Sequence, residues 1–225
     1  MVRLIGAIVI GVAGCAVLIA LGLWQSQRLA WKEGILADIT ARITAPPAPL
    51  PAAPDAEADR YLPVAIMGRF TGEALPVLVS VKGKGAGFRL IAAFETAEGR
   101  RVLVDRGFIP EAARAATPPA TGPARIEGNL HWPAEIDSFT PEPDTKLGIW
   151  FARDLPAMAA ALGTEPVLIV ARSADPADPA VTPLPLDTAS IPNDHLQYAV
   201  TWFSLAAVWA GMTALFVWRI RRRTA

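Results

Sequence analysis

The residues best suited to chemistry lie near the end of the chain, between Pro192 and Phe203. In this segment His195 is followed at helical spacing by Tyr198 and Trp202. Residues three, four and seven positions apart share one face of an α-helix, so an imidazole and two aromatic rings would form one stripe. A neutral imidazole is a common metal ligand. The stripe therefore fits a porphyrin, with its iron at His195 and its ring against the aromatic side chains.

A purely structural interpretation of the same stripe is also open. Tyr and Trp are enriched where a helix leaves a membrane, and a histidine there can simply hydrogen-bond to water or backbone. Asn193 or Asp194 would then cap the helix that follows. The second histidine, His131, precedes Trp132 in a predicted loop, and we expect it to be a surface residue beside a packing aromatic ring.

A second group of candidate residues follows the first apolar span. If that helix continues, Trp24, Arg28 and Trp31 align on one face. The two tryptophans could anchor the helix at the membrane surface while Arg28 reaches to water. Alternatively, the forked donors of Arg28 could pair with a carboxylate held between the two apolar helices. The two interpretations are compatible.

Other kinds of chemistry lack their motifs. The sequence contains no Cys-x-x-Cys-His for covalent haem, no phosphate-binding loop and no zinc motif. It has only two histidines, which excludes a cage of several imidazoles within one chain, and it has no nucleophile elbow. Its single cysteine, Cys15, can form no internal disulfide. We therefore do not expect hydrolase chemistry.

Two uncharged apolar spans must position the candidate residues, and we predict transmembrane helices at residues 4–23 and 196–218. Roughly 20 apolar residues suffice to cross a bilayer. The sequence Val-Ala-Gly-Cys that ends at Cys15 resembles a lipoprotein cleavage site, but the apolar run continues past the roughly 7–15 residues of a signal core, so we expect the helix to be retained. Small residues recur every four positions and predict close helix packing. They are Ala7, Gly11 and Cys15 in the first span and Ala206, Ala210 and Ala214 in the second.

Charge is segregated along the chain, although the 21 basic and 21 acidic residues cancel overall. All the acidic residues lie in residues 24–195, whereas both ends are basic. Basic flanks of membrane helices tend to stay in the cytoplasm. We therefore expect residues 1–3 and 219–225 to be cytoplasmic, and residues 24–195 to be extracytoplasmic. We therefore expect a multi-pass protein of a bacterial-type inner (plasma) membrane with a periplasmic central domain. We expect it to contact the lipid bilayer and not to bind nucleic acid.

Residues 24–195 are predicted to form one α+β domain, predominantly antiparallel β. Residues 25–41 favour a helical stalk, and the Pro/Ala-rich residues 45–54 an extended linker. The remaining predicted elements are β-prone runs at 61–70, 75–81, 87–96, 101–109 and 124–130, a helix at 153–162, a strand at 167–171 and an irregular proline-rich approach at 175–186.

Four ordered sequence blocks resemble the SURF1/Shy1 family. They are Gly22-Leu23-Trp24-Gln25 with Arg28 and Trp31-Lys32, then residues 102–110 (VLVDRGFIP), Trp150-Phe151-Ala152-Arg153-Asp154, and residues 192–203. The family's usual Asn before Arg-Gly is replaced by Asp105, and the usual Trp after it by Phe108. We therefore assign no catalysis there, and expect Arg106 to be a salt-bridge or turn residue that supports the domain.

The resemblance implies an assembly factor for haem-copper cytochrome c oxidase, and not an enzyme, that assists insertion of haem a into the catalytic subunit. It implies that haem a is a transiently bound cargo with His195 as the iron ligand. Tyr198, Trp202, Trp24 and Arg28 would complete the binding site. Haem a synthase or other oxidase assembly factors are further expected partners. The alternative is a haem-independent membrane scaffold that stabilises an oxidase assembly intermediate.

Overall fold

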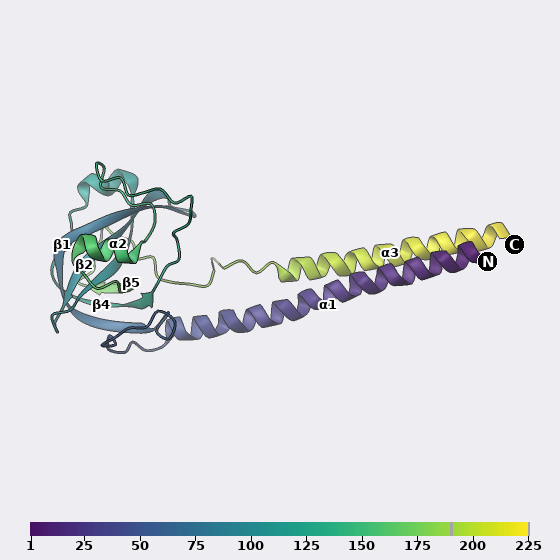
Figure 1. The fold of residues 1–225 in the computed structure, drawn as a ribbon, viewed down its shortest axis with the longest axis horizontal. Coiled ribbons are helices and arrows are strands. Elements are labelled where there is room, and N and C mark those ends of the chain that lie inside the picture. Colours follow the sequence, from purple (N-terminus) through teal and green to yellow (C-terminus); the bar gives the residue numbers. More distant parts are fainter. Residues whose placement is uncertain (190, 225) are drawn as a thin grey trace. The chain divides into compact units, whose positions relative to one another are not determined.

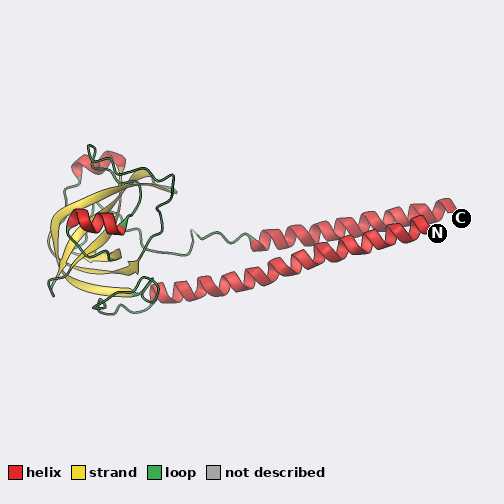
Figure 2. Ribbon diagram, viewed as in Figure 1, coloured by secondary structure: helices red, strands yellow, loops and turns green. Residues whose placement is uncertain are grey.

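The computed structural model describes residues 1–189 and 191–224, apart from the side chains of Arg3, Arg223 and Thr224. The chain forms two compact units. The helical unit comprises Met1–Asp38 and Thr188–Ala225, and the barrel unit comprises Ile39–Asp187. Figure 2 shows the division into long helices and a strand-rich part.

The helical unit is built from two long helices, α1 (Val2–Thr44) and α3 (His195–Thr224). Each is long and apolar enough to cross a membrane. The predicted continuation of the first helix through residue 41 is confirmed. The two helices run antiparallel and side by side (Figure 1), because Gly11 contacts Trp209 and Gln25 contacts His195.

Close packing between α1 and α3 depends on small residues. Trp209 Nε1 donates to Gly11 O at 3.1 Å, and Cys15 Sγ lies 3.8 Å from Ala206 O. A Cβ atom added at Gly14 would lie 2.4 Å from Trp209 Nε1. The predicted packing of small faces is therefore confirmed in part.

In the second helix Ala206 is buried, whereas Ala210 and Ala214 are exposed and line a shallow groove together with Gly11 and Cys15. Ala199, Ala206 and the half-buried Thr213 are spaced by seven along α3. A seven-residue repeat keeps one seam of a supercoiled helix on its partner, whereas a four-residue repeat drifts around the helix.

The barrel unit is a closed five-stranded barrel with the strand order β1-β2-β3-β5-β4. All neighbours pair antiparallel except β3 and β5, which are parallel, so the predominantly antiparallel α+β prediction is confirmed. The strands are β1 (Pro63–Val81), β2 (Gly85–Thr96), β3 (Arg101–Pro110), β4 (Thr121–His131) and β5 (Leu168–Asp175).

Strand β1 joins two β-prone runs that the sequence separated at residues 71–74. Its register with β2 shifts between Phe70 and Ala74, and Gly72 there has φ +89°. Such an irregularity bends a strand and raises its twist. The bend lets β1 pair with β4 through its first half and with β2 over most of its length, which closes the barrel.

The core has two layers on either side of the barrel wall. Alternate residues of β3 show this, since Val102 and Val104 belong to the interior cluster and Leu103 to an outer cluster. Helix α2 (Leu155–Leu162), predicted at 153–162, covers the outer cluster through its buried residues Leu155, Met158, Ala159 and Leu162. Asp154 caps this helix by accepting from Ala157 N at 3.1 Å.

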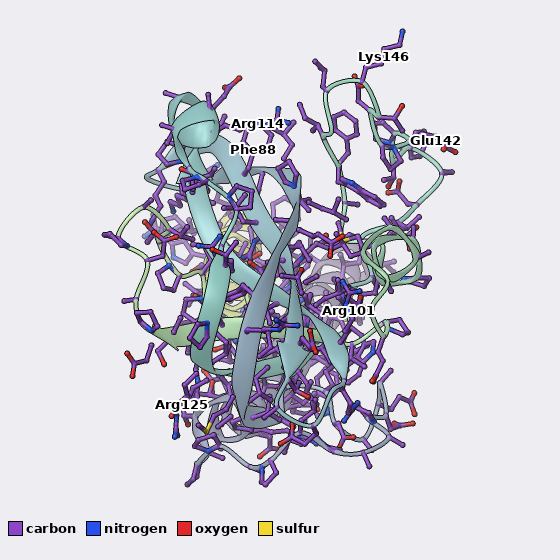
Figure 3. All side chains as sticks on the ribbon, turned by 90° about the vertical axis from the view of Figure 1, so that its left-hand side faces the viewer. Phe88, Arg101, Arg114, Arg125, Glu142 and Lys146 are labelled. Atoms are coloured by element: carbon purple, nitrogen blue, oxygen red, sulfur yellow. The ribbon has the colours of Figure 1, made fainter. Side chains whose placement is uncertain are left out.

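The connecting segments pack on the strands. Ala48 of the predicted linker bridges Val64, and Thr182 of the proline-rich segment exchanges two backbone hydrogen bonds with Phe108. The 3₁₀ helix η1 (Glu111–Ala116) follows β3 and places the Arg114 guanidinium 4.9 Å from the Phe88 ring. Figure 3 shows Arg114 beside Phe88, and the loop that carries Glu142 and Lys146 extending away from the strands.

Candidate functional site

The strongest candidate site lies in the helical unit, where the first residue of α3 meets α1. His195 Nδ1 lies 2.7 Å from Gln25 Oε1. Gln25 is only 8% exposed, whereas His195 is half-buried. A buried amide needs hydrogen-bond partners, and this contact supplies one. The imidazole is thereby held at the end of the helix pair by a residue of the opposite helix.

This contact selects one tautomer of the His195 imidazole. Gln25 Oε1 can only accept a hydrogen bond, so His195 Nδ1 is the donor and carries the proton. The lone pair of the neutral ring then lies on Nε2. In metal sites a histidine ligand commonly donates its other N–H to an oxygen acceptor, which fixes the tautomer and the orientation of the ring. The hydrogen bond to Gln25 would therefore orient the His195 ring for binding one metal ion through Nε2.

The aromatic residues predicted for this site lie on both helices, close in sequence to Gln25 and His195. Tyr198 is 54% exposed and Trp202 is half-buried, one and two turns into α3. On α1, Trp24 next to Gln25 is 52% exposed. These rings give the end of the helix pair broad apolar surface that is open to a flat ligand.

Arg28 does not join His195 in a shared contact in this structure. Its guanidinium lies 4.3 Å from the centroid of the Trp31 ring, on the exposed side of α1. This stacking agrees with the predicted alignment of Arg28 and Trp31 on one helix face. It leaves the guanidinium one turn from Gln25, where it can still pair with an anionic group.

The residues before α3 start the helix through their backbone. Tyr198 N donates to Asp194 O at 3.1 Å, so Asp194 occupies the capping position. Asn193 Oδ1 is buried and has no hydrogen-bond partner within residues 1–189 and 191–224. Of the two predicted caps, the geometry therefore favours Asp194.

A second polar cluster lies in the barrel unit and joins two of the sequence blocks singled out above. Asp105 on β3 is fully buried and accepts from Arg89 at 2.5 Å and from Gly107 N at 3.0 Å. Arg153 lies 3.5 Å from the same carboxylate and also pairs with Glu135. Burial alone would lower the pKa of Arg153, but the partner carboxylates outweigh it and raise that pKa above its usual value. Each charge has an opposite partner, which is typical of a structural network.

Comparison with known proteins decides the family. The model of the SURF1 family matches residues 12–207. Surfeit locus protein 1 of Homo sapiens is 31% identical over 213 residues, which cover 83% of this chain and 69% of that protein. A SURF1-like protein of Rickettsia felis is 32% identical over 203 residues, covering 84% and 87%. A SURF1-like protein of Monosiga brevicollis is 31% identical over 223 residues, covering 90% and 82%.

The chain belongs to the SURF1 family. Members of this family are cytochrome oxidase assembly factors and not enzymes. The matched region includes the contact between Gln25 and His195 as well as the whole barrel unit. Among the residues that the structure describes, no group of three His, Cys, Asp or Glu side chains could hold a metal ion.

Sequence reasoning missed the role of Gln25. Gln25 belongs to the first of the four sequence blocks, but its residue type alone indicates no function. A signal for it exists, because Gly11, Leu18 and Gln25 are spaced by seven along the packed side of α1. A polar residue continuing a buried seam needs a partner on the other helix, and His195 is that partner.

The prediction of a surface position for His131 is wrong. The ring is half-buried and stacks on Tyr61 with centroids 5.9 Å apart, and its buried Nδ1 has no hydrogen-bond partner in the described part of the chain. Burial, helped by the charges of Arg153 and Arg60, lowers the pKa of His131 to about 4. The unfolded chain binds a proton at His131 below about pH 6.5, whereas the folded ring stays neutral until about pH 4. This contribution to the free energy of unfolding is therefore fully present above about pH 6.5 and is lost as the pH falls towards 4. The predicted packing of Trp132 is confirmed.

Proposed function

We propose that this SURF1 family protein binds haem a transiently through His195 and assists its insertion into the catalytic subunit of cytochrome c oxidase. The observation that carries the proposal is the hydrogen bond from His195 Nδ1 to Gln25 Oε1, because it leaves Nε2 available as an iron ligand. The exposed rings of Tyr198 and Trp24 and the half-buried ring of Trp202 supply flat apolar surface nearby. Arg28 would pair with a propionate of the haem.

The composition of this site suits a protein that binds haem transiently better than one that retains haem as a permanent cofactor. One imidazole supplies one axial bond, and the exposed aromatic residues leave the ligand accessible from outside the helix pair. Two strong axial ligands in an enclosed pocket would slow release. A site of one histidine at the end of two helices therefore favours delivery to a recipient protein, and haem a synthase or another assembly factor would act as donor.

The same proposal places the protein in a bacterial-type inner membrane. Helices α1 and α3 would both cross it, with the termini in the cytoplasm and the barrel unit in the periplasm. Support comes from their length and apolar character and from the arginines that follow Trp218. Haem a is itself apolar, so a site where the helices leave the bilayer would take it from the membrane.

A haem-independent scaffold is the second candidate, and one observation favours it. The hydrogen bond between Gln25 and His195 links α1 to α3, so a purely structural role would also explain why both residues meet. In that case the protein would stabilise an oxidase assembly intermediate through its helices and barrel unit. The two candidates differ in what happens when the imidazole is removed.

Titration of the purified full-length protein with haem a, followed by its Soret band, separates them. We expect His195→Ala to weaken binding at least tenfold and to change the band. Gln25→Leu should weaken it by about 10–100-fold, the range observed when a residue that orients a metal ligand is lost. Gln197→Ala is the matched control, because Gln197 is an exposed residue of the same helix turn. Equal affinity and an unchanged spectrum in folded His195→Ala protein would favour the scaffold.

A further inference from the structure

A cavity of about 370 Å³ opens into the barrel unit, far along the chain from His195. Its inner wall is made by side chains of the barrel interior, including Phe70, Val104 and Ile126. Its outer wall comes from two proline-rich segments, residues 118–123 and 176–183. Proline and alanine side chains offer no hydrogen bonds and have few conformations to lose. Apart from Thr121, Ser173 and the Arg106–Asp178 pair, the lining residues are apolar, as in many small-molecule sites.

Arg106 places a charged group in this apolar cavity. It lies on the interior-facing side of β3, two residues after Val104, and its side chain is only 6% exposed. The guanidinium pairs with Asp178 and lies 5.4 Å from the centroid of the Phe70 ring. The expectation of a salt-bridge role for Arg106 is thus confirmed.

One part of this guanidinium lacks a partner. Arg106 Nη1 is buried and makes no hydrogen bond to any residue that the structure describes. An unsatisfied buried donor on a charged group is costly, so a ligand that supplies an acceptor would gain that energy. Burial also lowers the pKa of Arg106 below its usual value, in keeping with poor solvation of the charge. The pair with Asp178 already balances the charge, so Nη1 needs an acceptor and not a further anion.

We propose that this cavity binds an uncharged apolar small molecule through a carbonyl group that accepts a hydrogen bond from Arg106. The apolar side chains of the cavity would contact the apolar part of the molecule, and Arg106 Nη1 would donate a hydrogen bond to its carbonyl oxygen. An anion would have to compete with Asp178 for the same guanidinium, whereas a carbonyl would not. The site is separate in sequence and in chemistry from the His195 site, so it stands whether or not the protein binds haem.

Benzophenone is a suitable probe, because it is an uncharged apolar ketone that forms covalent bonds with nearby C–H groups when irradiated. The full-length protein in non-ionic detergent is irradiated with benzophenone, and the adducts are located by mass spectrometry of its peptides. We expect adducts concentrated on residues 118–126 and 176–183. Arg106→Met should reduce them about tenfold, since the hydrogen bond to a charged donor is lost. Arg125→Met is the matched control on β4, where the arginine is exposed and labelled in Figure 3.

A second variant keeps the test decisive if Arg106→Met fails to fold. Ala120→Trp would fill the cavity from a half-buried loop position and leave Arg106 in place, and it should abolish the same adducts. Ala112→Trp, on the exposed surface of η1, should not. Adducts spread evenly over the chain, or equal adducts in the parent and in Ala120→Trp, would overturn the cavity assignment. Adducts that persist in folded Arg106→Met would overturn the role of the carbonyl contact.

Discussion

Replacing Asp105 with alanine is expected to lower the free energy of unfolding of the barrel unit by about 3–5 kcal/mol. The carboxylate is fully buried and is the partner of Arg89. Removing it leaves that guanidinium, which is largely buried, without its counter-charge, and it also removes the acceptor of Gly107 N. Arg153 retains Glu135, so the network would be broken on one side only. Urea unfolding of the full-length protein, followed by circular dichroism of the strands, measures the loss.

Glu95→Ala is the matched control for this experiment. Glu95 also pairs with an arginine across neighbouring strands, but the side chain of Arg69 is 66% exposed. An exposed pair contributes at most about 1 kcal/mol. Asp105→Asn should lose less than Asp105→Ala, because it keeps an oxygen that accepts from Gly107 N. Equal stabilities for Asp105→Ala and Glu95→Ala would show that the buried network does not hold the barrel together.

Replacing Gly14 with leucine is expected to separate α1 from α3. A Cβ atom at this position would lie 2.4 Å from Trp209 Nε1, and the larger side chain cannot be accommodated without moving the ring. Moving it would break the hydrogen bond from Trp209 to Gly11 O. Because apolar burial does not drive helix association inside a membrane, close packing of this kind is the main attraction there. Overpacking typically costs about 1–3 kcal/mol, enough to shift a marginal helix pair.

Pulsed electron resonance on nitroxide labels at the exposed positions 20 and 205 reports the separation, in a Cys15→Ala background. We expect a narrow distance distribution in the parent and a longer, broader one in Gly14→Leu. Gly6→Leu is the matched control on the same helix, because a Cβ built there has no described atom within 4 Å other than its chain neighbours and its own helix backbone. Haem a affinity should fall in Gly14→Leu as well, since Gln25 would no longer meet His195. A parent-like distance distribution in Gly14→Leu would contradict the described packing.

Features encoded by local sequence were predictable. Twenty uncharged residues define the first apolar helix, and the spacing of Leu155, Met158 and Leu162 defines α2. The position of His195 at a helix start follows from the apolar run that comes after it. The strands followed from β-prone runs between turns, apart from the continuity of β1. A bulge keeps a strand going through polar residues that otherwise predict a turn.

Features that depend on pairing between distant segments were not predictable in the same way. No local sequence feature indicates that β5 pairs parallel to β3, or that Asp105 forms ion pairs with Arg89 and Arg153. The partner of His195 belongs to this class, because Gln25 is 170 residues away in the sequence. The inward position of Arg106 could be inferred from alternation along β3, but the cavity beside it required two loops whose paths the sequence leaves open.

The most direct test of haem ligation by His195 is rescue of a cavity variant with free imidazole. Magnetic circular dichroism of the haem-loaded full-length protein should show an imidazole-ligated iron, and His195→Gly should lose that signal. Added imidazole should then restore it, because Gln25 Oε1 remains in place to receive the N–H of the free ring. A His195→Gly protein that keeps the spectrum of the parent before any imidazole is added would contradict ligation by His195.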